Sequence, residues 1–218
     1  MKTALVYPKI PDTTNCPLKK CWVFEKLDGT NMHWDFKKHE FVSFGTRRDS
    51  FPFNEEGIQA FAKAHPGLEE APKAFDEVNM HDFLFTYHSG MTGTLFTEYT
   101  GLNSFAGQHK PGDTMRHVVI DLMKGKKFLP PQEFLSLFQS EWAATHGWDK
   151  IAHAQLLYCG KYSGQLVEDV RNGKFHVAEG VVIKGIADKQ VYMAKVKTNT
   201  YLAKLQEQFK DNWKDYWE

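Results

Sequence analysis

The chain has 218 residues, 42% of them hydrophobic and 14% aromatic, which is enough to bury the core of one large domain or two small ones. Basic and acidic residues are equal in number, 27 each, so the net charge of zero excludes the global basic field that marks many nucleic-acid-binding proteins. A basic groove confined to one region stays compatible with this balance.

The three cysteines, Cys16, Cys21 and Cys159, are an odd and sparse set, which disfavours a disulfide framework and indicates a reducing compartment. Their spacing relative to the histidines matches no standard zinc motif. The first residues lack the apolar run of a signal peptide, and no segment approaches the ~20 apolar residues of a membrane span. We therefore expect a cytoplasmic protein with no membrane partner.

The first predicted strands surround an Asp-Gly pair. Residues 22–24 and 32–36 alternate apolar and polar types on either side of Asp28-Gly29. Asp-Gly between two such runs predicts a β-hairpin, because glycine accepts a positive φ without a Cβ clash. A third strand is predicted at 40–44, after a polar turn.

Lys26 is predicted at the end of the first of these strands, on the same face as Phe24 and Asp28. A single lysine in this setting most often extends its amine to water from an edge strand. The alternative is that the amine of Lys26 acts as a nucleophile. At the ordinary lysine pKa of about 10.4 only about one amine in a thousand is neutral near pH 7.4, so desolvation and nearby cations would have to lower that pKa.

The rest of the chain mixes helices and strands. Helices are predicted from the N-cap residue Asn54 to Pro66-Gly67 and at 72–80, 130–145, 164–172 and 200–217. Strands are predicted at 82–87, 94–99, 117–122, 153–159, 177–186 and 191–196, with a glycine-rich loop at 101–113. Because these elements do not alternate as regular βαβ units, the predicted class is α+β with antiparallel sheets. The last helix has an apolar stripe, which we interpret as core packing; it consists of Leu202, Leu205, Phe209 and Trp213.

Charged residues recur at the predicted strands. There are four such clusters of charged residues. Any one of them alone is typical of a solvated strand face or of the start of a strand. In Lys195-Val196-Lys197, however, alternation places both lysines on one face, where their charges repel unless an anion lies between them. A phosphate, a metal ion and an activated lysine would explain the whole set. The other clusters are Thr46-Arg47-Arg48, Thr97-Glu98-Tyr99 and Glu179-Gly180 with Lys184.

These residues, in this order, resemble the covalent nucleotidyltransferases, the superfamily of ATP-dependent DNA and RNA ligases and mRNA capping enzymes. The resemblance covers residues from about 22 to 198. DNA ligases and capping enzymes usually have arginine where this chain has Asn31, so the chain is more similar to the RNA ligases, in particular to the nick-sealing type. Residues 97–109 are also similar to that branch. The matching set is Lys26-x-Asp28-Gly29, Glu98, Asp121, Glu179-Gly180-x-x-x-Lys184 and Lys195-x-Lys197.

The resemblance implies a nucleotidyltransferase domain of antiparallel sheets flanked by helices around a nucleotide cleft. It implies a single domain over 1–218, with the C-terminal helix at 200–217 leaving no room for a separate OB-fold or RNA-binding domain. The implied cofactors are ATP and Mg²⁺, with Mn²⁺ as the alternative metal. The implied partner is RNA with 5′-phosphate and 3′-hydroxyl ends, expected in a nicked duplex. An accessory RNA-binding protein could act in trans.

The resemblance also assigns roles. Lys26 would attack the α-phosphorus of ATP to form lysyl-AMP, Lys195 and Lys197 would hold the phosphate, and Glu179 would bind the metal ion. Adenine would lie between aliphatic residues, since the position where the family often has an aromatic residue holds an isoleucine. The implied nucleotide-binding residues are Glu25, Asn31, Arg47 with Arg48 as its alternative, Glu98, Ile120, Val182, Lys184, Lys195 and Lys197.

Two other functions are compatible with the same residues. One is a DNA nick-sealing ligase or a guanylyltransferase of the same fold, against which Asn31 argues. The other is a non-catalytic module that binds nucleotide or RNA, which the complete set of charged positions disfavours. A covalent adduct with labelled ATP, lost in Lys26→Ala, would distinguish the enzymes from the binding module.

Overall fold

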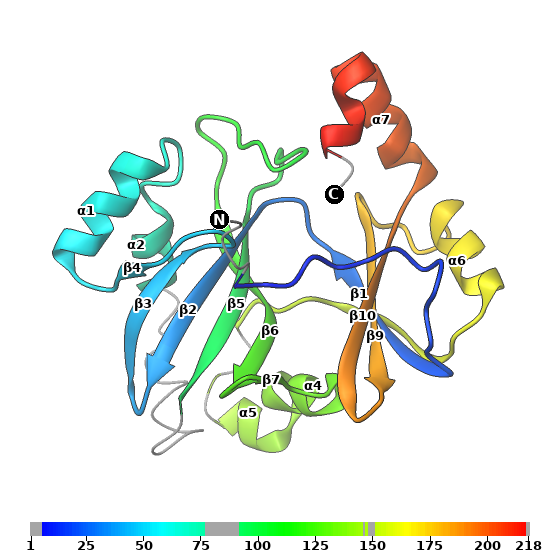
Figure 1. Cartoon of the computed structure of the whole chain (residues 1–218), viewed down its shortest axis with the longest axis horizontal. Helices are drawn as coiled ribbons and strands as arrows, with labels where there is room; N and C mark the ends of the chain where they lie inside the picture. The colour runs from blue at the N-terminus through cyan, green and yellow to red at the C-terminus, as the bar shows by residue number, and fades with distance from the viewer. Residues whose placement is uncertain (1–5, 77–91, 146, 148–150, 217–218) are drawn as a thin grey trace. The chain divides into compact units, whose positions relative to one another are not determined.

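The computed structural model describes residues 6–76, 92–145, 147 and 151–216, which belong to two compact units (Figure 1). The first unit consists of Met1–Lys9 and Gly29–His153, and the second of Ile10–Asp28 and Ala154–Glu218. Each unit is built on one antiparallel sheet. The antiparallel α+β class is therefore confirmed. That the two units act as one adenylyltransferase domain stays a prediction.

The first unit has a six-stranded sheet in the order β4-β3-β2-β5-β6-β7. Its strands are β2 (Thr30–Lys37), β3 (Glu40–Thr46), β4 (Phe51–Pro52), β5 (Thr92–Thr100), β6 (Arg116–Lys124) and β7 (Lys127–Phe128). Its helices are α1 (Glu55–Ala64), α2 (Ala71–Asp76), α4 (Pro131–Gln139) and α5 (Glu141–Thr145). The predicted cap of α1 is confirmed, since the Asn54 side chain accepts a hydrogen bond from the Gly57 backbone N–H.

Aromatic side chains form the core of the first unit. Trp34 on β2 is fully buried and stacks on Phe75 of α2, with 3.5 Å between ring centroids, and on Phe44 of β3 at 5.4 Å. These contacts attach α2 to the sheet through large apolar surfaces. The high aromatic content of the sequence is thus in part core packing.

A buried histidine completes this core. The Trp34 indole N–H donates to the Thr97 hydroxyl at 2.9 Å, and that oxygen lies 3.0 Å from Nδ1 of His117. His117 Nε2 lies 2.8 Å from the Ala71 carbonyl oxygen, which can only accept, so Nε2 carries the proton and Nδ1 accepts from the hydroxyl. Burial lowers the pKa of His117 to about 4.

We expect acid to destabilise the protein through His117. Its folded pKa of about 4 lies below the ordinary value near 6.5, so the unfolded chain binds the extra proton first and stability falls as the pH drops from 6.5 to 4. The loss between pH 7 and pH 4.5 is about 2 to 3 kcal/mol. Urea unfolding of the protein and of His117→Gln at both pH values measures it. Equal pH dependence in the two proteins would contradict the assignment to His117.

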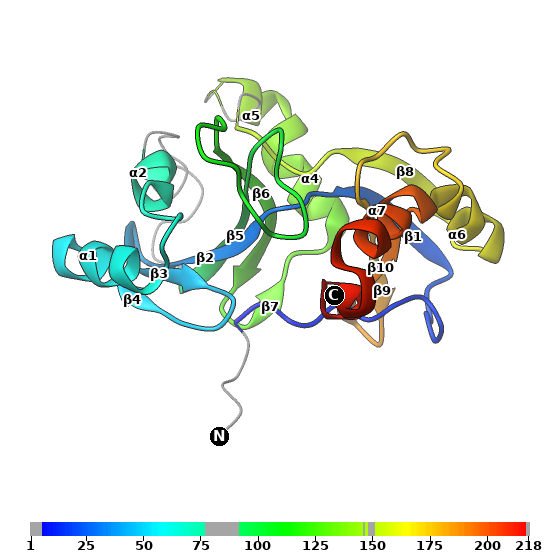
Figure 2. The ribbon, with the colours of Figure 1, turned by 90° about the horizontal axis from the view of Figure 1, so that it is seen from above.

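The second unit has a four-stranded sheet in the order β10-β9-β1-β8. Its strands are β1 (Lys20–Lys26), β8 (Leu156–Lys161), β9 (Gly180–Ala187) and β10 (Gln190–Lys197). Its helices are α6 (Gly164–Arg171), α7 (Asn199–Phe209) and the 3₁₀ helix η2 (Lys210–Tyr216), and β10 leads directly into α7 (Figure 2). One face of the sheet packs on α6 in an apolar core that includes Val23, Val181, Ile183, Val196, Leu166, Val167 and Val170.

The predicted hairpin at Asp28-Gly29 is wrong. β1 pairs with β8 and β9, whereas β2 pairs with β3 and β5, so the two strands lie in different sheets. Gly29 does not adopt a positive φ. Glycine is required there for another reason, because a Cβ would lie 2.4 Å from the backbone oxygen of Tyr99. The close approach to β5 explains the glycine that the hairpin pattern misread.

Several predicted boundaries also differ. The helix expected over 130–145 is interrupted at Ser140, whose backbone is extended, so α4 and α5 are separate. The C-terminal helix ends at Phe209, because Lys210 has a φ of 46° and the chain continues as η2. In its stripe Leu205 is buried, whereas the other three side chains are half-buried. The strand expected at 153–159 begins at Leu156, and the one expected at 177–186 begins at Gly180.

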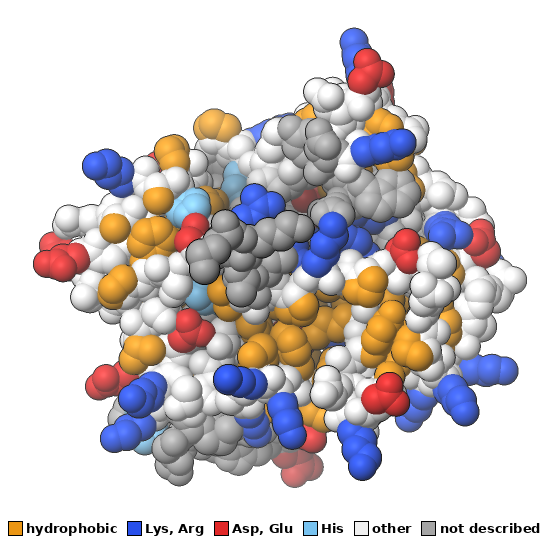
Figure 3. Space-filling model, viewed as in Figure 1, with side chains coloured by type: hydrophobic (Ala, Val, Ile, Leu, Met, Phe, Trp, Pro, Cys, Tyr) orange, Lys and Arg blue, Asp and Glu red, His pale blue; other side chains and the backbone are white. Residues whose placement is uncertain are grey.

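Two predictions concern residues outside the described ranges. These are the strand at 82–87 and the end of the helix at 72–80, of which α2 covers the first part. Among the described residues, no helix has both the length and the apolar character needed to cross a membrane. The face in Figure 3 carries basic and acidic side chains interspersed, in keeping with the balanced charge of the sequence.

Candidate functional site

The register of the second sheet places two lysines on either side of a glycine. Gly180 on β9 pairs with Lys26 on β1 and with Lys197 on β10, and the three strands are neighbours in the sheet (Figure 1). Directly paired residues in an antiparallel sheet point to the same face. Val196 belongs to the core on the opposite face, so the lysines lie on the face that α6 does not cover. The predicted placement of Lys197 opposite Val196 is therefore confirmed.

We expect Gly180→Ala to destabilise the protein by about 1 to 3 kcal/mol, because the added methyl group must displace backbone. A Cβ at this position would lie 2.1 Å from the backbone oxygen of Val196. Gly164→Ala is a matched control, since a Cβ at the start of α6 would meet nothing within 4 Å. Urea unfolding curves of both variants test the difference. A Gly180→Ala protein as stable as Gly164→Ala would contradict the close approach.

One buried carboxylate joins the two lysines. Glu179 immediately precedes β9, and its Oε2 lies 2.8 Å from Nζ of Lys26 while its Oε1 lies 3.0 Å from Nζ of Lys197. The side chains of Glu179 and Lys197 are 3% and 5% exposed, and that of Lys26 is 21% exposed. Both ammonium groups therefore share this one carboxylate beside Gly180, and the charge of Asp28 also acts on Lys197.

Opposing effects act on the pKa of Lys197. Burial lowers its pKa, the charge of Lys26 lowers it further, and the carboxylates of Glu179 and Asp28 raise it. The amine of Lys26 lies beside Lys197 on the other oxygen of the same carboxylate.

The same face carries two further lysines. Lys195 pairs with Val182, two residues along the strands from the Gly180–Lys197 pair, and its side chain is half-buried. Lys184 is 4% exposed, and its Nζ lies 5.0 Å from the ring centroid of Phe24, a distance typical of cation–π contacts. Val182, the partner of Lys195, is half-buried and precedes Lys184 by two residues on the same face of β9. The face is therefore a basic surface with apolar side chains between the charges.

Glu25 differs from the other predicted residues of this unit. It pairs with Val181, whose side chain lies in the core, so its register position is on the face opposite Lys26. Its backbone N–H donates to the carbonyl oxygen of Gln155 at 2.9 Å. Its role in nucleotide binding stays a prediction.

Sequence reasoning missed one side chain beside the lysines. Tyr201 on α7 is 4% exposed, its ring centroid lies 4.8 Å from Nζ of Lys197, and its hydroxyl donates to Oδ2 of Asp28 at 2.6 Å. Thr198 caps α7 by accepting from the Tyr201 backbone N–H, and its own N–H donates to the Glu179 carbonyl oxygen. A threonine just before an apolar helical stripe is a recognisable cap signal. The contact of the tyrosine with Lys197 is not readable from spacing.

The first unit holds the remaining predicted residues in an arrangement of its own. Asn31 on β2 pairs directly with Glu98 on β5. The Oδ1 atom of Asn31 is buried and accepts no hydrogen bond from the described residues. A buried acceptor of this kind is rare in folded proteins and fits a site that receives a donor from a ligand. The pairing of Asn31 and Glu98 on one strand face favours a shared binding role.

The N-terminal segment anchors Arg47. The Arg47 Nε–H donates to the Tyr7 carbonyl oxygen at 2.9 Å, and the Val6 N–H donates to the Arg47 carbonyl oxygen at 3.0 Å. The Tyr7 hydroxyl donates to Asp121 Oδ2 at 2.5 Å, and burial, followed by the Asp121 charge, raises the pKa of Tyr7 well above its usual value. Tyr7 therefore stays a donor over the whole working pH range. Arg48 contributes its backbone N–H to Thr46 and is exposed at this turn.

Ile120 lies at an irregularity of β6. Thr97 on β5 pairs with Val119 and Phe96 pairs with Asp121, so Ile120 forms a bulge between them. It belongs to the first unit, whereas Val182 belongs to the second. That these two residues enclose adenine stays a prediction.

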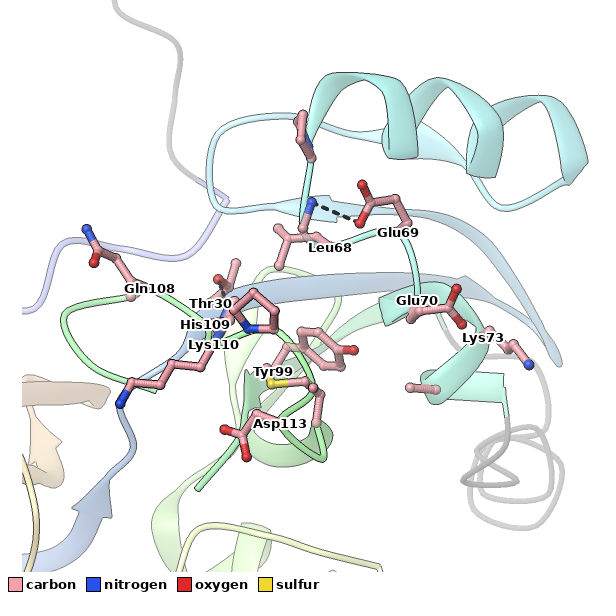
Figure 4. A pocket seen from close by; sticks show the side chains of 17 residues that line it. Thr30, Leu68, Glu69, Glu70, Lys73, Tyr99, Gln108, His109, Lys110 and Asp113 are labelled. Carbon is pink, nitrogen blue, oxygen red and sulfur yellow. Dashed lines mark hydrogen bonds between the residues drawn. The ribbon is translucent and has the colours of Figure 1, made fainter. Parts of the chain in front are cut away.

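A pocket of about 720 Å³ also lies in the first unit (Figure 4). Thr30 and Tyr99 line it, and each is the chain neighbour of Asn31 or Glu98, so the pocket opens on the other face of the sheet. His109 Nε2 lies 2.9 Å from the Thr30 hydroxyl, and its Nδ1 lies 3.0 Å from the Ser104 hydroxyl. The described residues that line the pocket include none of the predicted site residues, so we do not assign the nucleotide to it.

The predicted metal ion would need oxygen ligands, and the predicted one is the carboxylate of Glu179. Within the described ranges, no three histidine, cysteine, aspartate or glutamate side chains form a metal-binding group. Glu179 is a single carboxylate whose two oxygens already accept from lysines. A single carboxylate donor fits an ion such as Mg²⁺, which keeps several waters and binds through one or two carboxylates together with substrate phosphates. Glu179 as a metal ligand stays a prediction.

Comparison with known proteins gives the same superfamily. A family model described as RNA ligase matches residues 19–197. No curated protein matches the sequence. The architecture is similar to that of an RNA ligase of Naegleria gruberi, a mutant solved with ATP and Mn, with 17% identity, a TM-score of 0.66 and coverage of 95% of this chain and 60% of that one.

Two further solved structures have a similar fold. A second mutant of the Naegleria gruberi enzyme, solved with AMP and Mn, has 18% identity and a TM-score of 0.60, and the match covers 94% of this chain and 59% of that one. An archaeal ATP-dependent RNA ligase has 20% identity and a TM-score of 0.56, with coverage of 93% and 51%. The chain thus spans between 51% and 60% of the length of these structures. At these identities the similarity establishes the nucleotidyltransferase fold, and the match over residues 19–197 establishes the family. The chain therefore belongs to the RNA ligase family.

Proposed function

We propose that this chain is an ATP-dependent RNA ligase, acting in the cytoplasm, in which Lys26 forms a covalent lysyl-AMP intermediate. The observation that carries the proposal is the placement of Lys26 and Lys197 on either side of Gly180, joined by Glu179. In the first step the neutral amine of Lys26 attacks the α-phosphorus of ATP. A phosphorus–nitrogen bond forms, the bond to pyrophosphate breaks, and the amine loses its proton.

Residues of the second unit have different roles in this step. Glu179 holds Nζ of Lys26 at 2.8 Å and so orients the amine before it is deprotonated. Lys197 and Lys195 supply positive charge to the phosphoryl oxygens as their charge develops, which is the main contribution that phosphoryl transfer requires from a protein. Lys184 would complete the charge around the nucleotide, and Val182 would provide apolar contact to the base.

Residues of the first unit would bind the rest of the nucleotide. Glu98 and Arg47 would hold the ribose, and Asn31 would serve the later steps with RNA. The fixed position of Arg47 and the buried acceptor of Asn31 support these roles. Glu25 and Ile120 complete the proposed nucleotide-binding set.

A divalent cation is part of the proposal. A bound Mg²⁺ or Mn²⁺ would neutralise phosphate charge and polarise the phosphoryl group. Glu179 would hold it, directly or through its waters, at the edge of the lysine pair. The Naegleria gruberi enzyme was solved with ATP and Mn, which supports a divalent metal in the family.

The later steps would join RNA ends. AMP would pass from Lys26 to a 5′-phosphate, and a 3′-hydroxyl would then displace AMP to form the phosphodiester. A nicked duplex is the proposed substrate, because both ends are then held by base pairing. An accessory RNA-binding protein acting in trans would supply additional affinity where the duplex alone does not.

The proposal is tested by substrate choice. Purified protein is incubated with Mg²⁺ and α-labelled ATP or GTP, and then with nicked duplexes whose 3′-hydroxyl strand is RNA or DNA. We expect an acid-stable adduct with ATP and at least tenfold faster sealing of the RNA nick. Faster sealing of DNA would instead assign a DNA ligase, and labelling only by GTP a guanylyltransferase. No adduct with either nucleotide would leave a binding module and refute the proposal.

A further inference from the structure

Arg47 and Arg48 lie in the turn that joins β3 to β4 in the first unit (Figure 1). Asp49, the next residue of this turn, accepts hydrogen bonds at both carboxylate oxygens and at its backbone oxygen. In the proposed function Arg47 holds the ribose, so whatever fixes the turn also places this guanidinium. We infer that Asp49 is a positioning residue that holds Arg47 in place for the nucleotide. Its value for the reaction rests on the proposed function.

One carboxylate oxygen of Asp49 closes the turn. Its Oδ1 accepts from the Thr46 backbone N–H at 2.8 Å and from the Thr46 hydroxyl at 2.9 Å. The Arg48 N–H in turn donates to that hydroxyl oxygen at 3.4 Å. Hydrogen bonds to a carboxylate are charge-assisted and stronger than those between neutral groups. Arg47 lies between the two residues joined in this way, so its backbone is held from both sides.

The other two acceptors of Asp49 attach the turn to α1 and β2. Nε2 of His65, the C-cap of α1, lies 2.7 Å from Asp49 Oδ2. His33 on β2 is 1% exposed, and its Nε2 lies 2.9 Å from the Asp49 carbonyl oxygen. Because a carbonyl oxygen can only accept, Nε2 of His33 carries the proton and donates. Gly45 leaves room for this contact, since a Cβ there would lie 2.3 Å from the same oxygen.

The side chain of Arg47 depends on the backbone that Asp49 fixes. Its Nε–H reaches the Tyr7 carbonyl oxygen at 2.9 Å only while residue 47 stays where the turn places it. Removing the Asp49 side chain leaves the Thr46 N–H without its acceptor, and water must take its place. The turn then samples other conformations, in which Arg47 lies away from Tyr7. The affinity for a ligand falls in proportion to the fraction of molecules whose site is in the binding conformation.

The direct test follows the Arg47 side chain by NMR without a nucleotide. Protein labelled with ¹⁵N at arginine is studied as wild type, Asp49→Ala and Asp49→Asn, with the Arg47 Nε–H signal assigned by its loss in Arg47→Lys. We expect hydrogen exchange at this Nε–H to be at least about threefold faster in Asp49→Ala, because the turn opens more often. Asp49→Asn keeps an acceptor oxygen for Thr46 and should stay within about twofold of wild type.

Asp113→Ala is the matched control, since it removes another carboxylate that closes a loop of the first unit. Asp113 Oδ2 accepts from the Asn103 backbone N–H at 2.8 Å. We expect a comparable loss of thermal stability in this variant and no change in the exchange of the Arg47 Nε–H. Unchanged exchange in Asp49→Ala, or an equal change in Asp113→Ala, would overturn the inference.

His65→Phe is the milder variant for the case in which Asp49→Ala does not fold. It removes the donor to Asp49 Oδ2 but keeps an aromatic ring against Phe61, whose centroid lies 4.8 Å from that of His65. The Arg47 Nε–H should again exchange faster than in wild type. An unchanged rate in His65→Phe would then contradict the inference.

The consequence for the nucleotide is measured by a double-mutant cycle. Calorimetry gives the affinity for ATP with Mg²⁺ of Asp49→Ala, Arg47→Ala and the double variant, all in a Lys26→Ala background that forms no adduct. We expect Asp49→Ala to weaken binding roughly three- to tenfold where Arg47 is present and less than about twofold where it is absent, because Asp49 acts through Arg47.

The outcomes of the cycle are distinguishable. Equal weakening with and without Arg47 would assign Asp49 to general stability and overturn the inference. If the Lys26→Ala protein with both Asp49 and Arg47 intact binds no ATP, the proposed function fails. The exchange of the Arg47 Nε–H then still decides whether Asp49 holds Arg47 in place.

Discussion

Replacement of Lys26 by alanine or by arginine is expected to remove covalent labelling by α-labelled ATP, with a loss of more than about 100-fold. Alanine has no nucleophile. Arginine keeps the positive charge that pairs with Glu179 but stays protonated at any working pH, so it cannot attack phosphorus. Gel autoradiography after acid quenching measures the adduct.

Lys20→Arg is the matched control for this experiment. Lys20 begins the same strand, lies on the same face as Lys26 by alternation, and its Nζ is 4.8 Å from the Trp22 ring. We expect full labelling in this variant. Equal loss in Lys20→Arg, or labelling that survives in Lys26→Arg, would assign the nucleophile to another residue. The fold should be retained in Lys26→Ala, because Glu179 stays paired with Lys197.

Replacement of Glu179 by glutamine is expected to destabilise the protein and to impair adenylylation together. The carboxylate is 3% exposed and accepts from two lysines, so its removal takes away the negative charge that both ammonium groups share. Breaking a buried ion pair in this way typically costs about 3 to 5 kcal/mol, and the partial exposure of Lys26 places the expected value at the lower end. Urea unfolding measures the loss.

The pH dependence of that loss identifies its cause. Glu179 raises the pKa of Lys197, so in Glu179→Gln this pKa falls further below its ordinary value. A lysine with a lowered folded pKa costs stability at neutral pH, because folding then places the charged amine in surroundings that disfavour it. That cost disappears as the pH rises toward the ordinary lysine pKa of about 10.4. We therefore expect a smaller destabilisation at pH 10 than at pH 7. A constant difference would indicate lost packing instead of unpaired charge.

The same variant tests the metal role. If Glu179 holds Mg²⁺, Glu179→Gln should require a higher Mg²⁺ concentration for half-maximal labelling. An unchanged dependence on Mg²⁺ would remove Glu179 from the proposed metal site and leave it as the residue that orients the lysines. Lys184→Met is a useful comparison, since it removes a charge from the same face without removing a carboxylate.

Sequence patterns within a few residues were sufficient to predict several caps, helix ends and strand faces. The cap at Asn54 and the end of α6 before Gly173 follow from side-chain chemistry within a few residues, and the structure has both of them. Strand alternation also correctly placed Lys197 on the face opposite Val196. These features depend on backbone geometry close in sequence, so the sequence contains the information.

The hairpin at Asp28-Gly29 failed because the pairing of strands is not local. The turn signal describes which backbone conformations are allowed, but not which partners the strands will find. β1 buries Val23 against α6, whereas β2 buries Trp34 against α2 and β3, and the chain passes from one sheet to the other at the predicted turn. Burial of these separate apolar faces outweighs the local preference for a hairpin.

By itself the sequence determined the order of the motifs, the class of the fold and the strand faces on which the lysines lie. Only the tertiary structure decided that Lys26 and Glu179, 153 residues apart, form an ion pair that also includes Lys197, and that Tyr201 covers one of these amines. The physical reason is that motif spacing limits which residues share a face of one strand. Contacts between strands depend on sheet register, which is determined by the burial of the core on the opposite face of the sheet.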